Sequence, residues 1–234
     1  MKTYINMKIK HYLVNGELKE IAPHIYCVAV EDAYDRAMLF ARYQEFYESP
    51  IKGIRNKFFT LEGLMKRYRD HYKKDSFTYP EDWAGYNIPS YSLEKAIEKF
   101  GDKNITEYDE IMRNIVSKCE AKSYRLNKGT KHNWYLIGTD NFKSKTMDHE
   151  MAHALYYTNP EYKKNCDELI SNIKISHYNK LTKILVGIGY LDNKKIIDDE
   201  IQAFMSTGLY NKLDDEKLKP YTKEFIKNFK RFNK

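Results

Sequence analysis

One short segment, residues 146–157, constrains this chain more than any other because it contains the pattern His-Glu-x-x-His. Apolar residues recur along the segment at helical spacing, and an Asn-Pro pair stops it, so we predict a helix that begins after Thr146. Residues four apart lie on the same face of a helix, which places His149 above His153. Glu150 precedes the second histidine by three positions and leans over the same face.

These three side chains have the chemistry of a metal site. Two imidazoles one helical turn apart can hold one tetrahedral ion, and zinc accepts nitrogen ligands at about 2.0–2.1 Å. A carboxylate on the same face can take a proton from water beside the ion. We therefore predict Zn²⁺ as the cofactor, with His149 and His153 as ligands and Glu150 as the general base.

A catalytic zinc site needs a third protein ligand, and a later segment offers one. Residues 195–208 predict a helix that ends at a capping glycine. Glu200 lies on this helix among apolar neighbours, where a buried carboxylate is costly unless it is paired or bound to a metal. We predict Glu200 as the third ligand. Three other residues of the right chemical type remain rivals, namely His177, Asp198 and Asp199.

The remaining sequence predicts an α+β fold. Residues 1–30 have strand-like patterns, and the pair Asn15-Gly16 predicts a tight hairpin turn. An aromatic stretch over 77–90, interrupted by prolines and a glycine, predicts a loop. Helical spacing occurs in four further segments of the first half, residues 31–48, 60–72, 90–100 and 106–119.

The pattern changes near residue 121. Residues 123–126 and 133–137 resemble two strands joined by a turn, and this hairpin leads into the histidine helix. We predict a mainly helical part over 121–234, with that small hairpin before the histidine helix. We expect it to pack on an N-terminal α+β part of unknown role over 1–120, as one continuous body. An amphipathic C-terminal helix over 221–232 is typical of a helix that docks on the rest of the fold.

The motif resembles a known family. His-Glu-x-x-His on one helix, followed by a glutamate on a later helix, resembles the gluzincin branch of the zincin metallopeptidases. The order of strands, metal helix and glutamate helix also resembles a compact minigluzincin-type core, over residues 121–208. The resemblance implies zinc bound by His149, His153 and Glu200, with Glu150 as general base. It implies a hydrolase, a zinc metalloprotease that cleaves a peptide or protein substrate.

The sequence departs from other zincins at identifiable positions. Thermolysin-like members carry an acid four residues after the third ligand, where this chain has Phe204. The group that orients a ligand histidine must then come from another position or be a backbone carbonyl. Metzincins extend the motif with a glycine and a third histidine, and Tyr156 and Asn159 occupy those positions here. The metzincin branch is therefore excluded.

The resemblance also suggests where a substrate binds. By family analogy, the strand before the metal helix would pair with an extended substrate as an added strand. That strand comprises Trp134, Tyr135, Leu136, Ile137 and Gly138. A tyrosine or histidine usually helps to hold the developing oxyanion. The candidates for that role are Tyr156, Tyr157, Tyr190 and His132.

A second function class is a binding protein with a non-catalytic or vestigial zincin site. Lys+Arg 40 against Asp+Glu 33 gives a net charge of +7, which permits nucleic-acid contact without requiring it. Tyr68 and Tyr72 lie within a basic segment and would stack on bases. Together with the C-terminal helix, the basic residues of 52–74 would carry nucleic-acid or protein binding: Lys52, Arg55, Lys57, Lys66, Arg67, Arg69, Lys73 and Lys74.

Three features predict a cytoplasmic protein. The cysteines Cys27, Cys119 and Cys166 are odd in number and widely spaced, which favours a reducing compartment over a disulfide framework. The N-terminal residues lack the apolar segment of about 7–15 residues that a secretory signal contains. No window approaches the roughly 18 apolar residues that a membrane span needs.

Overall fold

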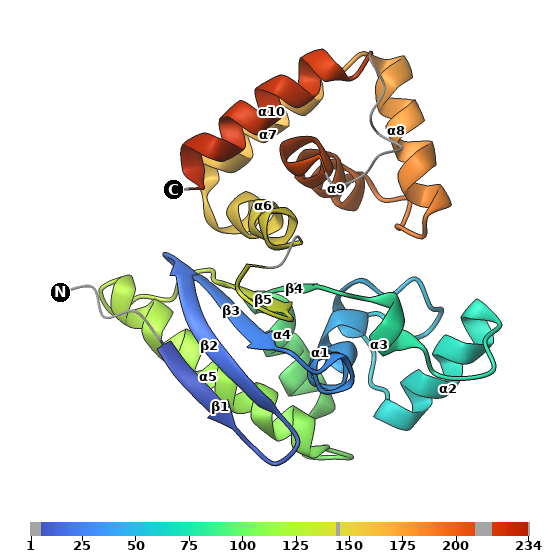
Figure 1. Cartoon of the computed structure of the whole chain (residues 1–234), viewed down its shortest axis with the longest axis vertical. Coiled ribbons are helices and arrows are strands. Elements are labelled where there is room, and N and C mark those ends of the chain that lie inside the picture. Colours follow the sequence, from blue (N-terminus) through green and yellow to red (C-terminus); the bar gives the residue numbers. More distant parts are fainter. Residues whose placement is uncertain (1–5, 144–145, 209–216, 234) are drawn as a thin grey trace. The chain divides into compact units, whose positions relative to one another are not determined.

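The computed structural model describes residues 6–143, 146–208 and 217–233 (Figure 1). The chain forms two compact units, Met1–Ser144 and Lys145–Lys234. All five strands of the described residues belong to the first unit, and the described part of the second unit contains helices only. The predicted α+β class is confirmed. The boundary lies at Ser144 rather than near residue 121, because the strand before the metal helix belongs to the N-terminal sheet.

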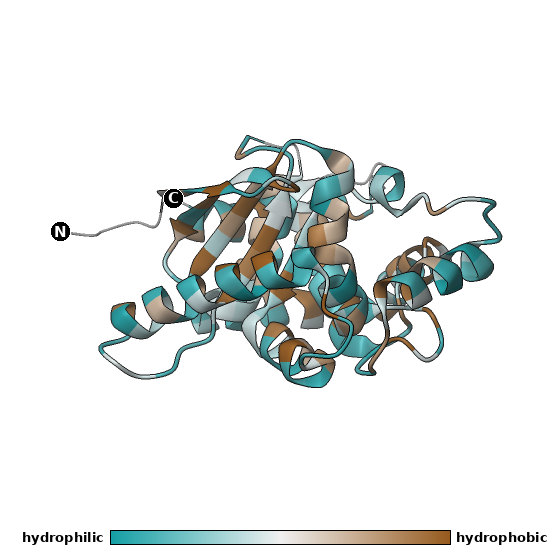
Figure 2. Ribbon diagram, turned by 90° about the horizontal axis from the view of Figure 1, so that it is seen from below, coloured by the Kyte–Doolittle hydropathy of each residue, from teal (hydrophilic) through white to brown (hydrophobic). Residues whose placement is uncertain are grey.

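The N-terminal unit is built on one mixed sheet with the strand order β1-β2-β3-β5-β4. Strands β3 and β5 pair in parallel, and the other neighbours pair antiparallel. Figure 2 shows brown, hydrophobic stretches along these strands. The strands are β1 (Asn6–Lys10), β2 (Asn15–Ala22), β3 (Ile25–Val30), β4 (Tyr86–Pro89) and β5 (Tyr135–Thr139).

Three of the described helices of this unit begin at side chains that accept backbone hydrogen bonds. Asp32, Thr60 and Thr106 each cap the helix that follows, and Thr106 forms a capping box with Asp109. These caps are local signals, so most of the predicted helices are confirmed. The helices are α1 (Ala33–Glu48), α2 (Leu61–Tyr72), α3 (Tyr79–Asp82), α4 (Ser90–Phe100) and α5 (Glu107–Leu126).

The core of the unit lies between the sheet and helices α1, α4 and α5 (Figure 1). Leu18 pairs with Val28 across β2 and β3, and Tyr26 pairs with Leu136 across β3 and β5. Residues directly opposite one another point to the same face, so this face carries the core. On β5, a side chain at Gly138 would lie 2.6 Å from the ring of Phe40 on α1, so the glycine lets helix and strand approach closely.

Two strand predictions were wrong. Asn15 and Gly16 lie inside β2 and pair with Lys10 and Ile9, so the turn is the preceding segment 11–14. Residues 123–126 form the last turn of α5 rather than the first strand of a hairpin. Of these four residues only Ser123 is buried, and the hydrogen bond from Asn127 N to Ser123 O, 3.0 Å, continues the helical pattern through the segment. Strand β5 instead pairs with β3, more than a hundred residues earlier in the chain.

The C-terminal unit is a cluster of helices. Helix α6 packs on α7 and α9, α10 packs on α7 and α9, and α8 packs on α9. Phe225 and Phe229 of α10 are buried, so the predicted amphipathic helix docks within this unit. None of the described helices has the length and apolar content needed to cross a bilayer. The helices are α6 (Met147–Thr158), α7 (Pro160–Ser171), α8 (Ile175–Gly187), α9 (Lys194–Thr207) and α10 (Lys219–Phe232).

Candidate metal centre

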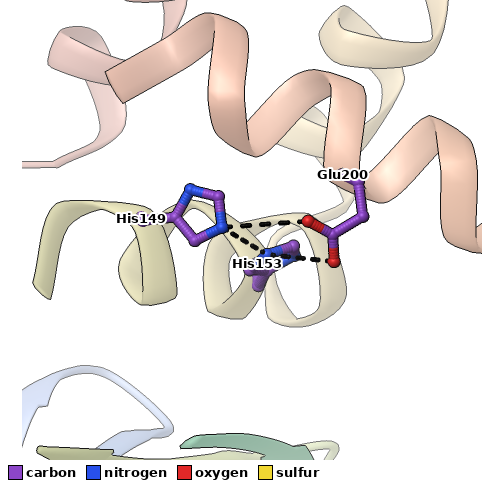
Figure 3. Close-up of side chains that lie close together, drawn as sticks. All are labelled: His149, His153 and Glu200. Atoms are coloured by element: carbon purple, nitrogen blue, oxygen red, sulfur yellow. Dashed lines mark hydrogen bonds and ion pairs between the residues drawn. The ribbon is translucent and has the colours of Figure 1, made fainter. Parts of the chain in front are cut away.

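The predicted metal ligands come together inside the C-terminal unit. His149 and His153 lie one turn apart on α6, and Glu200 reaches them from α9 (Figure 3). The Nε2 atoms of the two histidines are 3.2 Å apart. The Glu200 carboxylate faces both, with Oε2 at 3.8 Å from His149 Nε2 and Oε1 at 3.6 Å from His153 Nε2. The three side chains are only 8%, 3% and 5% exposed, respectively.

These separations fit a metal ion. Ligand atoms about 2.0–2.1 Å from a tetrahedral zinc lie roughly 3.3–3.4 Å from one another. The Nδ1 of His153 lies 2.8 Å from Asp199 Oδ1, and because an ionised carboxylate only accepts, His153 donates there. The neutral imidazole then keeps its lone pair on Nε2. That lone pair faces a second imidazole and a carboxylate. A buried group of three lone-pair donors is costly alone, whereas a cation at its centre satisfies all three. His149, His153 and Glu200 can therefore hold a metal ion.

The two histidines have opposite electrostatic environments. Burial lowers the pKa of His149 well below its usual value, and charge on His153 lowers it further. Burial also opposes charge on His153, but the carboxylates of Asp199 and Glu200 outweigh it and raise the pKa of His153 to about 10. Without a bound metal ion, His149 is uncharged at neutral pH and His153 carries an additional proton, on Nε2. A metal ion that binds here must displace that proton.

Asp199 supplies the orienting carboxylate that Phe204 cannot. Its Oδ1 accepts from His153 Nδ1 and fixes which ring nitrogen faces the centre. It comes from the residue immediately before Glu200 instead of four residues after it. The ring of Phe204 packs against His149, with centroids 4.5 Å apart. The Nδ1 of His149 is buried and has no hydrogen-bond partner among the described residues.

The rival third ligands lie elsewhere or have other partners. Asp198 accepts hydrogen bonds from Tyr178 at 2.8 Å and Lys194 at 2.5 Å. His177 on α8 packs edge-on against Tyr221 of α10, 5.9 Å between ring centroids. Asp199 touches a ligand histidine and is not itself in the metal-binding group. Among the described residues, Glu200 is the third member.

Glu150 lies on the same helix as the two histidines. It is buried, and its charge contributes, after those of Asp199 and Glu200, to the raised pKa of His153. It does not belong to the group of three that could hold a metal ion. Its predicted role as general base stays a prediction.

The structure places the four oxyanion candidates in different surroundings. The Tyr156 hydroxyl donates to Asp167 on α7 and accepts from Lys163 at 3.0 Å, so it is held by that helix. His132 belongs to the N-terminal unit, where its ring stacks on His24 at 3.8 Å. Tyr157 is half-buried on α6. The ring of Tyr190 lies 6.3 Å from Phe204, which itself contacts His149.

The predicted substrate strand has no open edge. Strand β5 pairs with β3 on one side and β4 on the other, so a peptide cannot add to it as a further strand. Trp134, just before β5, is also engaged, because its backbone oxygen accepts from Ser90 N at 2.9 Å. Gly138 makes room for Phe40. Tyr135, Leu136 and Ile137 are likewise interior residues of a central strand, and this prediction was wrong.

The basic segment over 52–74 has structural partners. Tyr68 is buried, and its hydroxyl donates to Asp82 at 2.7 Å, while the ring of Tyr72 lies 4.6 Å from that of Tyr68. Lys74 donates to the same aspartate. Arg67 donates to the backbone oxygen of Gly53 at 3.1 Å. These contacts argue against base stacking by Tyr68.

Comparison with protein-family models, with curated proteins and with solved structures finds no match to this chain. The chemistry of the site is therefore inferred from its geometry.

Proposed function

We propose that this chain is a zinc-dependent metallopeptidase of the gluzincin type, which hydrolyses peptide bonds with Glu150 as general base. One observation carries the proposal: two Nε2 atoms from α6 and a carboxylate from α9 converge in a buried group next to a buried glutamate. Three protein ligands leave a position open at a tetrahedral ion, which is the pattern of a catalytic site rather than a structural one. The zincin-like core thus consists of α6 and α9.

His149, His153 and Glu200 would hold the ion. A bound Zn²⁺ polarises a carbonyl oxygen and lowers the pKa of a water that it coordinates. Glu150 accepts the proton of the attacking water on its carboxylate and gives it to the nitrogen of the leaving amine. Asp199 holds the ring of His153 throughout, because its hydrogen bond to Nδ1 fixes the tautomer.

The test separates metal binding from catalysis. Zinc content and cleavage of a peptide library are measured for the full chain and for Glu150→Gln, which keeps the shape of the side chain and removes the base. We expect the variant to retain zinc and to lose cleavage by about 10²–10⁴-fold, the range that general-base catalysis contributes.

Glu168→Gln is the matched control, because Glu168 is an exposed carboxylate on α7 whose neighbour is Lys164. It should retain both zinc and cleavage. Unchanged cleavage by Glu150→Gln would remove the general base from the proposal, and a wild-type chain that binds no zinc would remove the metallopeptidase.

We also propose a cytoplasmic location. All three cysteines are buried, and none forms a disulfide. Buried thiols of this kind are typical of proteins from a reducing compartment.

A further inference from the structure

A chain of polar side chains leads away from His153 into the interior of the C-terminal unit. Asp199 Oδ1, which accepts from His153, also accepts from Gln202 Nε2 at 2.9 Å. The other end of that amide, Gln202 Oε1, accepts from the hydroxyl of Tyr162 at 2.8 Å. The Tyr162 oxygen in turn lies 3.2 Å from Ser206 Oγ. The chain joins α6, α9 and α7.

The hydrogen bonds of this chain all run in one direction. Because the Asp199 carboxylate only accepts, the amide must present its N–H₂ group to it. The amide oxygen therefore faces Tyr162, which donates its single proton there and can only accept from Ser206. Every donor beyond Asp199 points toward Asp199. A reversed amide would place its oxygen against the carboxylate, so Asp199 determines which end of Gln202 faces it, and the hydroxyl of Tyr162 holds the amide in that orientation by donating to its oxygen.

Water cannot substitute for these partners. Gln202 and Tyr162 are 0% exposed. The ring of Tyr162 is packed against α10, with Phe229 at 6.5 Å and Phe232 at 5.6 Å between centroids. A buried amide that loses a hydrogen-bond partner stays unsatisfied, which costs free energy. The side chain of Gln202 is therefore held in one orientation, with both of these hydrogen bonds formed.

We infer that Gln202 and Tyr162 are positioning residues for the metal ligand His153, acting through Asp199. Gln202 holds the aspartate against the imidazole, and Tyr162 holds the amide in the required orientation. The inference rests on the metal site of the proposed function and is independent of peptide cleavage. It assigns to the docked C-terminal helix α10 a part in setting metal affinity, because that helix seats the ring of Tyr162.

The experiment measures Zn²⁺ affinity of the full chain by competition with a chelator, and the visible absorption spectrum of the Co²⁺-loaded protein. Gln202→Leu removes the amide at similar volume. We expect zinc binding to weaken on the order of tenfold, the lower end of the range for partners of a metal ligand, with a shifted Co²⁺ spectrum. Tyr162→Phe removes one hydroxyl and should give a smaller loss.

A double-mutant cycle distinguishes action in series from general destabilisation. Tyr162→Phe should weaken zinc binding in the wild-type chain and have no further effect in Gln202→Leu, because the hydroxyl acts only through the amide. Ile201→Val is the control, because Ile201 is buried on the same helix and takes no part in these hydrogen bonds between side chains. It should lower thermal stability and leave zinc affinity and the Co²⁺ spectrum unchanged.

The outcomes are separable. If Gln202→Leu and Tyr162→Phe bind zinc with wild-type affinity and a wild-type Co²⁺ spectrum, Gln202 and Tyr162 contribute only to packing. The inference then fails, while the metal site stands. Equal losses in Ile201→Val would overturn it as well. If Gln202→Leu does not fold, Tyr162→Phe alone decides, since it removes a single oxygen. A wild-type chain that binds neither ion overturns the proposed function itself.

Discussion

The two units bury charged side chains in contrasting ways. In the N-terminal unit, Arg42 and Asp109 are 2% and 3% exposed and form an ion pair. Arg42 also donates to the backbone oxygens of Phe59 at 2.9 Å and Asn104 at 3.3 Å, and its guanidinium lies 4.1 Å above the ring of Phe100. Because a cation and an anion are both present, the buried charges of this cluster balance.

The buried cluster of the C-terminal unit is incomplete by the same criterion. The carboxylates of Asp199, Glu200 and Glu150 all act on His153, which lies beside an uncharged His149. One proton on His153 compensates only part of this, which is why its pKa is raised. The comparison teaches that burial alone does not identify a functional site. The informative property is whether the buried charges balance one another or require an outside partner.

The largest expected effect comes from breaking the complete cluster. Arg42→Ala leaves Asp109 buried and without its cation, and we expect about 3–5 kcal/mol loss in the free energy of unfolding of the N-terminal unit. Denaturant unfolding followed by hydrogen exchange measures this loss of stability and shows which of the two units it affects. Arg67→Ala is the control, because that guanidinium is exposed and donates only to Gly53 O among the bonds of this region. A loss below about 1 kcal/mol in Arg42→Ala would contradict the comparison.

Removing the cation should have the next largest effect, confined to the other unit. With free zinc at about a hundred times its Kd, withdrawal by a chelator should cost the C-terminal unit about 2.7 kcal/mol. Backbone amides of α6 and α9 should exchange faster, and those of the N-terminal sheet should not change. In His153→Ala the chelator should have no effect. Equal responses of both units in the wild-type chain would show that the site is not local to α6 and α9.

A smaller effect is expected from the orienting carboxylate. Asp199→Asn weakens the hydrogen bond to His153 Nδ1, and zinc affinity should fall about 10–100-fold. Asp198→Asn is a matched control, since the adjacent acid binds Tyr178 and Lys194 outside the centre. Equal affinities of the two variants would mean that Asp199 does not position the ligand.

A pH dependence is expected as well, with opposite signs for the stability of the metal-free C-terminal unit and for its affinity for zinc. In the metal-free protein, His153 has a pKa of about 10 against 6.5 ordinarily. The stabilisation from its proton is fully present below pH 6.5 and is lost as the pH rises toward 10. Zinc must displace the same proton, so zinc affinity should rise over that window. Unfolding and zinc titrations between pH 6.5 and 9 measure both, and parallel trends would contradict the assignment.

The sequence by itself determined the local elements of the site. The apolar spacing and the Asn159-Pro160 stop specify α6, and Gly208 in a left-handed conformation ends α9 as expected. Helix α10 could equally be predicted from its amphipathic pattern. Caps, stops and helical periodicity act between residues a few positions apart, so they are visible without the fold.

Only the tertiary structure decided the long-range questions. Strand β5 and its partner β3 are more than a hundred residues apart, and no local signal shows that β5 completes the N-terminal sheet rather than a hairpin before the metal helix. The same holds for Asp198, Asp199 and Glu200, three consecutive acids. Successive residues of a helix point about 100° apart, so the packing of α9 on α6 and α8 turns Asp198 to Tyr178, Asp199 to His153 Nδ1 and Glu200 to the group that could hold a metal ion.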